Sequence, residues 1–224
     1  MAALNVEVDF CKLKQDLADG YDVKAQCYAE SVPPIHLKEF LADQIRAFYS
    51  QVLTSTSTKP VLLDLGAGPG NDAKYLQEMG ADITCVDLST EMLSLCMGKN
   101  LKIRKEDFCN LTIPDSSVDG IIMNFSFLHI PKNHGLSTLE SVRQKIKACG
   151  SFLITVFEGS GEGFEIKTKY PKPRYFSYYS TDEIVHLLQS AGYISLDIQK
   201  LENKPRNVIS VICQNQNSTF QVGS

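Results

Sequence analysis

The sequence predicts an α/β domain in which a mostly parallel β-sheet is covered by helices on both faces. Short apolar runs alternate along the chain with segments of helical periodicity, which is the pattern of consecutive βαβ units. The apolar run Val61 to Leu65 leads directly into a turn that contains Gly66, Gly68 and Gly70. Asp87 ends the next apolar run, and the carboxyl ends of strands are where such sheets bind their ligands.

The N-terminal part of the chain predicts a helical cap over residues 1–58, followed by the sheet domain over residues 59–224. Tyr21 and Tyr28 are seven residues apart, so a helix would place both rings on one face. They are either core aromatics of the cap or part of a ligand site. Ile35 to Leu53 repeats its apolar residues at helical spacing and predicts an amphipathic helix.

The glycine turn and its surroundings indicate the kind of cofactor. A dinucleotide fingerprint G-x-G-x-x-G that starts at Gly66 would need a third glycine where the chain has Asn71. Asp64, two residues before the first glycine, would repel a phosphate and attract a cation. S-adenosylmethionine (SAM) carries an ammonium and a sulfonium but no phosphate, and its adenosine offers ribose hydroxyls to Asp87. An NAD-dependent dehydrogenase is the alternative.

Four segments in order carry a resemblance to a known family. DLGAGPG, followed by VDLS at Asp87, resembles motif I and the acidic loop of class I SAM-dependent methyltransferases of the small-molecule type. The segments Glu106 to Phe108, Ser116 to Ile130 and Gly150 to Gly159 resemble the next three pieces of that family. The resemblance implies a Rossmann-like seven-stranded sheet of order 3-2-1-4-5-7-6 with an antiparallel last strand. It also implies methyl transfer from SAM, with S-adenosylhomocysteine (SAH) as the product.

The resemblance further implies roles for individual residues in cofactor binding. A Y-D-x-x-A-x-x-Y segment that begins at Tyr21 lies over the methionine end of SAM in many small methyltransferases, and Asp107 takes the adenine amino group. Leu88 and Met92 either pack on adenine or belong to the core. The predicted cofactor-binding residues are Tyr21, Tyr28, Asp64, Gly66, Gly68, Gly70, Asp87, Leu88, Met92, Asp107, Phe108 and Asn124.

The predicted acceptor side begins at the exit of the apolar run Val118 to Met123. Asn124 there is followed by Phe-Ser-Phe, whereas methylases of base amines carry an N/D-P-P-Y type motif. His129 is either a general base or substrate contact, or a packed histidine. The irregular, aromatic segment Glu158 to Ser180 is expected to form the pocket wall, or else a solvated loop with packed rings. The predicted catalytic residues are His129, Arg174 and Tyr178.

Two helices and two strands complete the predicted order. Ser137 to Ala148 reads as a helix, Thr181 as the cap of another helix, and Tyr193 to Gln214 as two antiparallel strands with a short connection.

Composition limits the classes of partner. A net charge of −4 disfavours broad nucleic-acid binding. There is no apolar run long enough for a bilayer and no signal-peptide pattern, and the seven cysteines contain no C-x-x-C. We therefore expect a cytoplasmic protein without membrane contact or metal site, which methylates an oxygen or nitrogen of a small molecule. A peptide, protein or RNA methyltransferase, or a SAM-binding subunit without catalysis, is the alternative; the sequence leaves the oligomeric state open.

Overall fold

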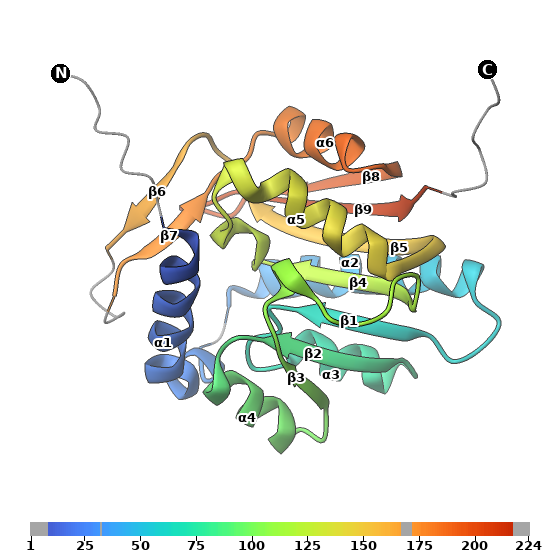
Figure 1. Ribbon diagram of the computed structural model, residues 1–224, viewed down its shortest axis with the longest axis horizontal. Coiled ribbons are helices and arrows are strands. Elements are labelled where there is room, and N and C mark those ends of the chain that lie inside the picture. The colour runs from blue at the N-terminus through green and yellow to red at the C-terminus, as the bar shows by residue number, and fades with distance from the viewer. Residues whose placement is uncertain (1–8, 32, 167–171, 217–224) are drawn as a thin grey trace.

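The computed structural model describes residues 9–31, 33–166 and 172–216. Within them, the main sheet has seven strands in the order β3-β2-β1-β4-β5-β9-β8 (Figure 1). The pairs among β1 to β5 are parallel, whereas β9 is antiparallel to both β5 and β8. This confirms the expected sheet order, because β8 and β9 are the sixth and seventh strands of the sheet along the chain.

The strands arise where the sequence is apolar enough to be buried on both faces. In β1 the run after the first residue is fully buried, and in β4 only the last residue is partly exposed. The strands are β1 (Val61–Leu65), β2 (Asp82–Asp87), β3 (Lys102–Lys105), β4 (Val118–Asn124), β5 (Ile146–Phe157), β8 (Tyr193–Leu201) and β9 (Val208–Asn215).

Helices cover both faces of the sheet, as expected. α2 (Ile35–Ser55) and α3 (Asn71–Glu78) lie behind the sheet in Figure 1, and α5 (Lys132–Lys145) and α6 (Thr181–Ser190) lie in front. α4 (Thr90–Gly98) packs its apolar residues into the same core as α2 and α3. Alternate residues of each central strand serve the two cores, since Leu62 packs toward α2 and Leu63 toward α5.

A long helix and a small hairpin lie at the carboxyl ends of the parallel strands. α1 (Phe10–Ala29) stands beside the hairpin formed by β6 (Glu162–Glu165) and β7 (Arg174–Ser177) in Figure 1. Asp9 begins α1 by accepting a hydrogen bond from the backbone N–H of Lys12. Asp22 joins α1 to the start of α4, because its Oδ1 accepts from Ser89 Oγ at 2.5 Å and from the Glu91 N–H at 3.0 Å.

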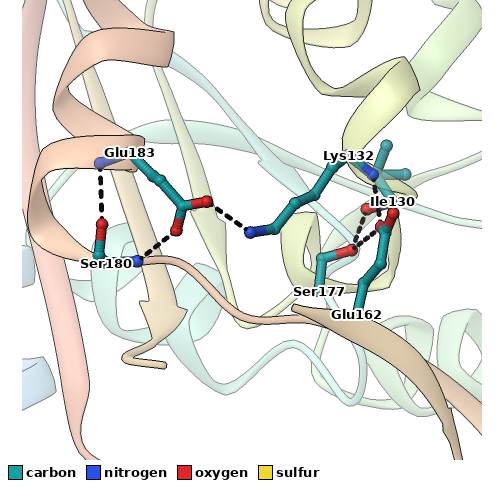
Figure 2. Close-up of polar contacts among 6 residues, drawn as sticks. All are labelled: Ile130, Lys132, Glu162, Ser177, Ser180 and Glu183. Carbon is teal, nitrogen blue, oxygen red and sulfur yellow. Dashed lines mark hydrogen bonds and ion pairs between the residues drawn. The ribbon is translucent and has the colours of Figure 1, made fainter. Parts of the chain in front are cut away.

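Three expectations for the second half of the chain were wrong in detail. The segment 158–180 is not wholly irregular, because it contains β6 and β7, and its residues 167–171 lie outside the described residues. α5 begins at Lys132 rather than Ser137, and β5 begins at Ile146, inside the range predicted as helix. The cap of α6 is Ser180, not Thr181, because Ser180 forms a reciprocal capping box with Glu183 (Figure 2).

None of the helices among the described residues combines the length and the apolar composition that a membrane span requires.

Candidate functional site

A cavity of about 770 Å³, its open mouth included, lies where β1, β2 and β4 end. One wall comes from the glycine turn and the ends of these strands, and the opposite wall comes from α1. The lining residues are Lys14, Leu17, Ala18, Tyr21, Tyr28, Gly66, Gly68, Asp87, Leu88, Met92, Asp107, Phe108, Asn124, Phe125, Ser126, His129 and Ile130.

The glycine turn is compact because its first glycine touches the exit of β4. Gly66 has a φ of +71°, and a Cβ added there would lie 2.3 Å from Cβ of Ser126. Ser126 Oγ donates a hydrogen bond to the carbonyl of Leu65 at 2.6 Å, which closes the contact. Only glycine fits both the left-handed backbone and this close approach. The turn therefore presents its backbone to the cavity instead of side chains.

Asp87 connects the glycine turn to the start of α4. Its Oδ2 accepts from the Gly68 N–H and its Oδ1 from the Ser89 N–H, both at 2.9 Å. Burial raises the pKa of the Asp87 carboxyl above its usual value, although these backbone donors act in the opposite direction. The carboxylate thus lies at the cavity surface with a fixed orientation.

Two more carboxyl groups lie beneath the turn. Asp64 is 3% exposed, and its Oδ2 has no hydrogen-bond partner among the described residues. Burial, and next the charge of Asp72, raise the pKa of Asp64 well above its usual value. Asp72 accepts from Asn124 Nδ2 at 2.8 Å, and Asn124 Oδ1 accepts from Thr155 Oγ1 at 2.6 Å. This part of the site is an acidic environment that a cation would stabilise.

On the α1 side, Lys14 forms an ion pair with Asp107. Asp107 also accepts from the backbone N–H of Cys109 at 2.9 Å, so its two oxygens have different partners. The rings of Tyr21 and Tyr28 meet edge to face, with their centroids 5.8 Å apart. The ion pair between Lys14 and Asp107 holds α1 against the rim of the cavity.

His129 lies at the other end of the cavity, within a chain of hydrogen bonds. Its Nδ1 lies 2.7 Å from the carbonyl oxygen of Tyr175, and its Nε2 lies 3.0 Å from the hydroxyl of Tyr21. A carbonyl only accepts, so Nδ1 carries the proton and Nε2 accepts from Tyr21. Arg174 Nη1 donates to the same Tyr21 hydroxyl at 3.1 Å. Three distant segments therefore meet at one tyrosine.

The imidazole of His129 stays neutral at physiological pH. Burial above all, together with the nearby guanidinium groups of Arg174 and Arg206, lowers the pKa of His129 to about 4. The hydrogen bond to the Tyr175 carbonyl acts in the opposite direction but does not compensate. His129 therefore acts here as a neutral hydrogen-bond acceptor for Tyr21.

A group of four aromatic rings, called the aromatic cluster, lies next to His129. It consists of Phe125, Phe157, Phe176 and Tyr178. The ring centroid of Phe157 lies 5.2 Å from that of Phe125 and 6.3 Å from that of Phe176. The Arg206 guanidinium lies over Phe157 at 4.8 Å and over Phe176 at 4.6 Å. Glu165 pairs with Arg206 and accepts from the Tyr178 hydroxyl.

Glu162 fastens the β6–β7 hairpin to the rest of the site (Figure 2). Its Oε2 accepts from the backbone N–H of Lys132 at 2.7 Å, at the first turn of α5. Pro131, the N-cap residue of α5, makes no side-chain cap, so Glu162 supplies the missing acceptor from another element. The Ser177 hydroxyl lies 3.0 Å from Glu162 Oε2 and 2.7 Å from the carbonyl oxygen of Ile130. The hairpin is thus tied to the segment that follows His129.

Most of the residues expected at the cofactor site line the cavity. The exceptions are Asp64, which lies beneath the turn, and Gly70, where an added Cβ would lie 2.7 Å from Cys96 Sγ. Of the three residues expected to be catalytic, His129 lines the cavity, Arg174 reaches it through Tyr21, and Tyr178 points to Glu165.

Tyr21 was expected at the site, but its neighbours on the same face of α1 and Arg206 were not. Lys14, Leu17, Ala18 and Tyr21 follow the i, i+3, i+4, i+7 spacing of a helix face, so periodicity could have added the first three. Arg206 comes from the β8–β9 connection, where no local pattern marks it. The exit residues Phe125, Ser126 and Ile130 also line the cavity.

Comparisons with known proteins agree with this architecture. The sequence model of a family described as "Methyltransferase domain" matches residues 63–154, from β1 into β5. An uncharacterized methyltransferase of Geobacillus sp. (strain WCH70) is 24% identical over 144 residues, which are 62% of this chain and 63% of the relative. The chain therefore aligns with less than two thirds of that relative's length.

Solved structures share the fold at low sequence identity. One is a Burkholderia thailandensis 1,6-didemethyltoxoflavin-N1-methyltransferase crystallised with 1,6-didemethyltoxoflavin and SAH. It has a TM-score of 0.72 and 19% identity, with 97% of this chain and 93% of that chain covered. Another is the cyclase SpnF, with a TM-score of 0.70 and 12% identity over 91% of this chain and 96% of its own. The same fold thus occurs in proteins named for different reactions.

Proposed function

We propose that this chain, a member of the class I SAM-dependent methyltransferase family, binds SAM in the cavity and methylates a small molecule. The observation that carries the proposal is the buried Asp64 carboxylate, whose Oδ2 is unpartnered among the described residues, beneath a glycine turn that opens onto the cavity. A buried carboxylate of this kind calls for a cation, and a pyrophosphate would be repelled.

The residues present fit each part of SAM. Asp87 would accept from the ribose hydroxyls, and the backbone of Gly66 and Gly68 would take the methionine end. Asp64 and Asp72 would offset the charge of the α-ammonium, with the Asn124 carbonyl as a direct acceptor. Leu88, Met92 and Phe108 would surround the adenine, with Asp107 at its amino group.

The catalytic contribution of the protein is to orient the acceptor and exclude water. When bound, SAM supplies an electrophilic methyl group on a sulfonium. Tyr21 and Tyr28 close the cavity from α1, and His129 holds the Tyr21 hydroxyl in one direction. Fixing a nucleophile at roughly 3–3.5 Å from the reacting carbon accounts for much of the rate in such displacements.

Calorimetry with SAH, followed by turnover with methyl-labelled SAM, tests the proposal. We expect SAH to bind, and Asp64→Asn to weaken SAH binding about tenfold or more, since a hydrogen bond to a charged group contributes about 1.5–3 kcal/mol. Asp82→Asn is the matched control, because Asp82 lies at the opposite end of β2 and pairs with Lys102 at 2.6 Å.

The binding of SAM should also release protons. The cationic ammonium would lower the raised pKa of Asp64, so part of the protonated population would ionise on binding. Titrations in buffers of different ionisation enthalpy would reveal this release, and Asp64→Asn should remove it. Tight NAD binding without SAH binding would overturn the proposal. SAH binding with methyl transfer only after a second polypeptide is added would favour a non-catalytic SAM-binding subunit.

A further inference from the structure

We infer that α1 holds in place the two carboxylates that would bind the adenosine of SAM, with Lys14 and Asp22 as the positioning residues. Lys14 acts through Asp107, the carboxylate assigned to the adenine amino group. Asp22 acts through Ser89 on Asp87, which would bind the ribose. The inference rests on the proposed function and adds that adenosine binding and the docking of α1 are coupled.

Lys14 holds Asp107 from the α1 side of the cavity. Its Nζ forms an ion pair with Asp107 Oδ2, while Asp107 Oδ1 accepts from the backbone N–H of Cys109 at 2.9 Å. The Lys14 and Asp107 side chains are 20% and 24% exposed, so water competes only in part with this pair. The carboxylate is thus held at both oxygens. A carboxylate oxygen has two lone pairs, so an oxygen bound to one donor can also accept from an adenine amino group.

The position of Lys14 is itself determined by a second element. Its Nζ lies 4.5 Å from the ring centroid of Phe10, a distance at which a cation and a ring attract each other. The Phe10 ring stacks on His134 of α5, with the centroids 4.4 Å apart. Although burial acts to lower it, the hydrogen bond and the charge of Asp107 raise the pKa of Lys14 above its usual value. Lys14 therefore reaches Asp107 as a charged group with a fixed approach.

Asp22 acts on the ribose side through one intervening residue. Its Oδ1 accepts from the Ser89 hydroxyl at 2.5 Å and from the Glu91 N–H at 3.0 Å. Ser89 is fully buried, and its backbone N–H donates to Asp87 Oδ1 at 2.9 Å. A negative charge at the first turn of α4 is also favourable for that helix. Asp22 therefore fixes the segment that orients the Asp87 carboxylate.

α1 depends on polar contacts of this kind because it buries few of its residues. Of its 20 residues, four are buried, namely Leu13, Ala18, Gly20 and Ala25. Lys14 and Asp22 are eight residues apart in the chain, which corresponds to about 12 Å along a helix axis. Leu17 and Ala18 lie between them in the chain and line the cavity, as does Met92 of α4. The adenosine would thus lie beneath the part of α1 between its two anchors.

Coupling between α1 and adenosine follows from this arrangement. Each carboxylate would bind adenosine in the orientation that an α1 residue fixes. A variant without that residue has to order the carboxylate when the ligand binds, and this lowers the affinity for adenosine. By thermodynamic linkage, adenosine in turn stabilises the docked α1 by the same factor, and couplings between sites typically change affinity by about 5–150-fold.

Calorimetry with SAH and with methylthioadenosine tests the inference. Methylthioadenosine contains the adenosine and the thioether sulfur but lacks the α-ammonium and the carboxylate of SAH. Lys14→Met and Asp22→Asn should each weaken the binding of both ligands by about fivefold or more. Asp64→Asn should instead weaken SAH and leave methylthioadenosine unchanged, because the charge that Asp64 would offset is absent from the smaller ligand.

Two other residues of α1 provide matched controls. Lys12→Met removes a lysine that is exposed. Asp19→Asn removes a carboxylate that bonds Gln15 and Lys172 instead of a residue beside the adenosine site. Both control variants should keep the wild-type affinity for the two ligands.

The adenine amino group separates the two positioning residues. S-inosylhomocysteine carries an oxygen in place of that group, which a carboxylate cannot bind, so the wild-type protein should prefer SAH. Lys14→Met should reduce this preference several-fold, whereas Asp22→Asn should weaken both ligands equally. Lys14→Arg keeps a cation beside Asp107 and should restore most of the preference. If Lys14 only stabilised the fold, its loss would lower both affinities by the same factor.

Hydrogen exchange supplies the reciprocal measurement. Saturating methylthioadenosine should slow the exchange of the α1 backbone amides in the wild-type protein, and less so in Lys14→Met and Asp22→Asn. Absence of this protection in the wild-type protein would contradict the coupling. Urea unfolding shows which variants fold, and Lys14→Gln and Asp22→Ser replace any that does not.

Three results in calorimetry would overturn the inference while SAH still binds the wild-type protein. The first is unchanged affinity for both ligands in Lys14→Met and Asp22→Asn. The second is weaker SAH binding by these variants with unchanged methylthioadenosine binding, and the third is an equal loss in Lys12→Met and Asp19→Asn. Failure of the wild-type protein to bind SAH would instead overturn the proposed function.

Discussion

The two ends of the cavity are built in different ways. The end formed by Gly66, Gly68 and Asp87 comes from one continuous βαβ segment. The hydrogen bond from the Gly68 N–H to Asp87 joins two residues of that segment. The other end brings together His129, Arg174 and Arg206, which belong to η2 (Phe127–His129), β7 and the β8–β9 connection. A short segment can therefore specify the first end, whereas only the complete fold assembles the second.

This difference suggests which end can vary without loss of the fold. The glycine turn is fixed by steric contacts with β4 and by backbone hydrogen bonds, so few substitutions are compatible with it. Phe176 and Arg174 lie on a separate hairpin and Arg206 lies on a loop, all outside the main sheet. Loops on a rigid scaffold are where specificity usually changes. The predictions below compare the two ends directly.

Gly66→Ala should have the largest effect of any substitution considered. The added Cβ would meet Ser126 Cβ at 2.3 Å, and the left-handed φ of +71° adds strain. We expect a loss of several kcal/mol, in the range of about 1–3 kcal/mol for overpacking plus the backbone term, and no SAH binding. Urea unfolding and calorimetry would measure both.

Gly20→Ala provides the contrast for that substitution. Gly20 lies inside α1, and a Cβ there would find no heavy atom within 4 Å. Alanine should therefore stabilise the protein by about 0.4–1 kcal/mol through the unfolded chain and helix propensity. Equal destabilisation by both substitutions would show that the Ser126 contact is not the cause.

Asp87→Ala should have the second-largest effect, and this effect should be on cofactor binding. The ribose would lose two hydrogen bonds to a charged acceptor, at about 1.5–3 kcal/mol each, so SAH affinity should fall about 10²–10⁴-fold. The Gly68 and Ser89 N–H groups also lose their acceptor, which loosens the turn. Asp82→Ala, at the other end of β2, should leave SAH binding unchanged in the same titration.

The sequence was sufficient to predict the fold and most of the cofactor end, for a physical reason. Strand burial and the glycine spacing are local properties, and Asp87 is the last residue of its strand. By contrast, β6 and β7 pair across a segment whose breaks suggest a loop, and Arg206 lies beside Phe176 only after β8 and β9 have formed. Pairing and packing over such sequence distances leave no periodic signal.

His129 provides a pH test of the acceptor end. The pKa of an exposed histidine is near 6.5, and burial lowers that of His129 to about 4. Between these values the unfolded state binds a proton that the folded state does not, so stability falls as pH decreases from about 6.5 to about 4. The loss attributable to this residue is on the order of 3 kcal/mol at most.

The contribution of His129 can be separated from that of other titrating groups. His129→Gln cannot titrate, so the difference in unfolding free energy between wild type and variant should change over this window and be constant above pH 7. A parallel pH dependence in the two proteins would mean that His129 is charged or exposed in the folded state. A Gly66→Ala variant that still folds should retain the wild-type slope, because it removes no titrating group.

Glu162→Gln should produce the smallest effect and reach only the acceptor end. The amide can still accept from the Lys132 N–H, but the negative charge near the first turn of α5 is lost, which costs about 0.3–1 kcal/mol. Because Glu162 also contacts Ser177 of β7, the hairpin should loosen, and the KM for the acceptor should rise several-fold while SAH affinity is unchanged. Glu140→Gln, an exposed position on the same helix, is the control for charge alone. If SAH affinity fell together with acceptor affinity in the Glu162 variant, the two ends of the cavity would not be independent.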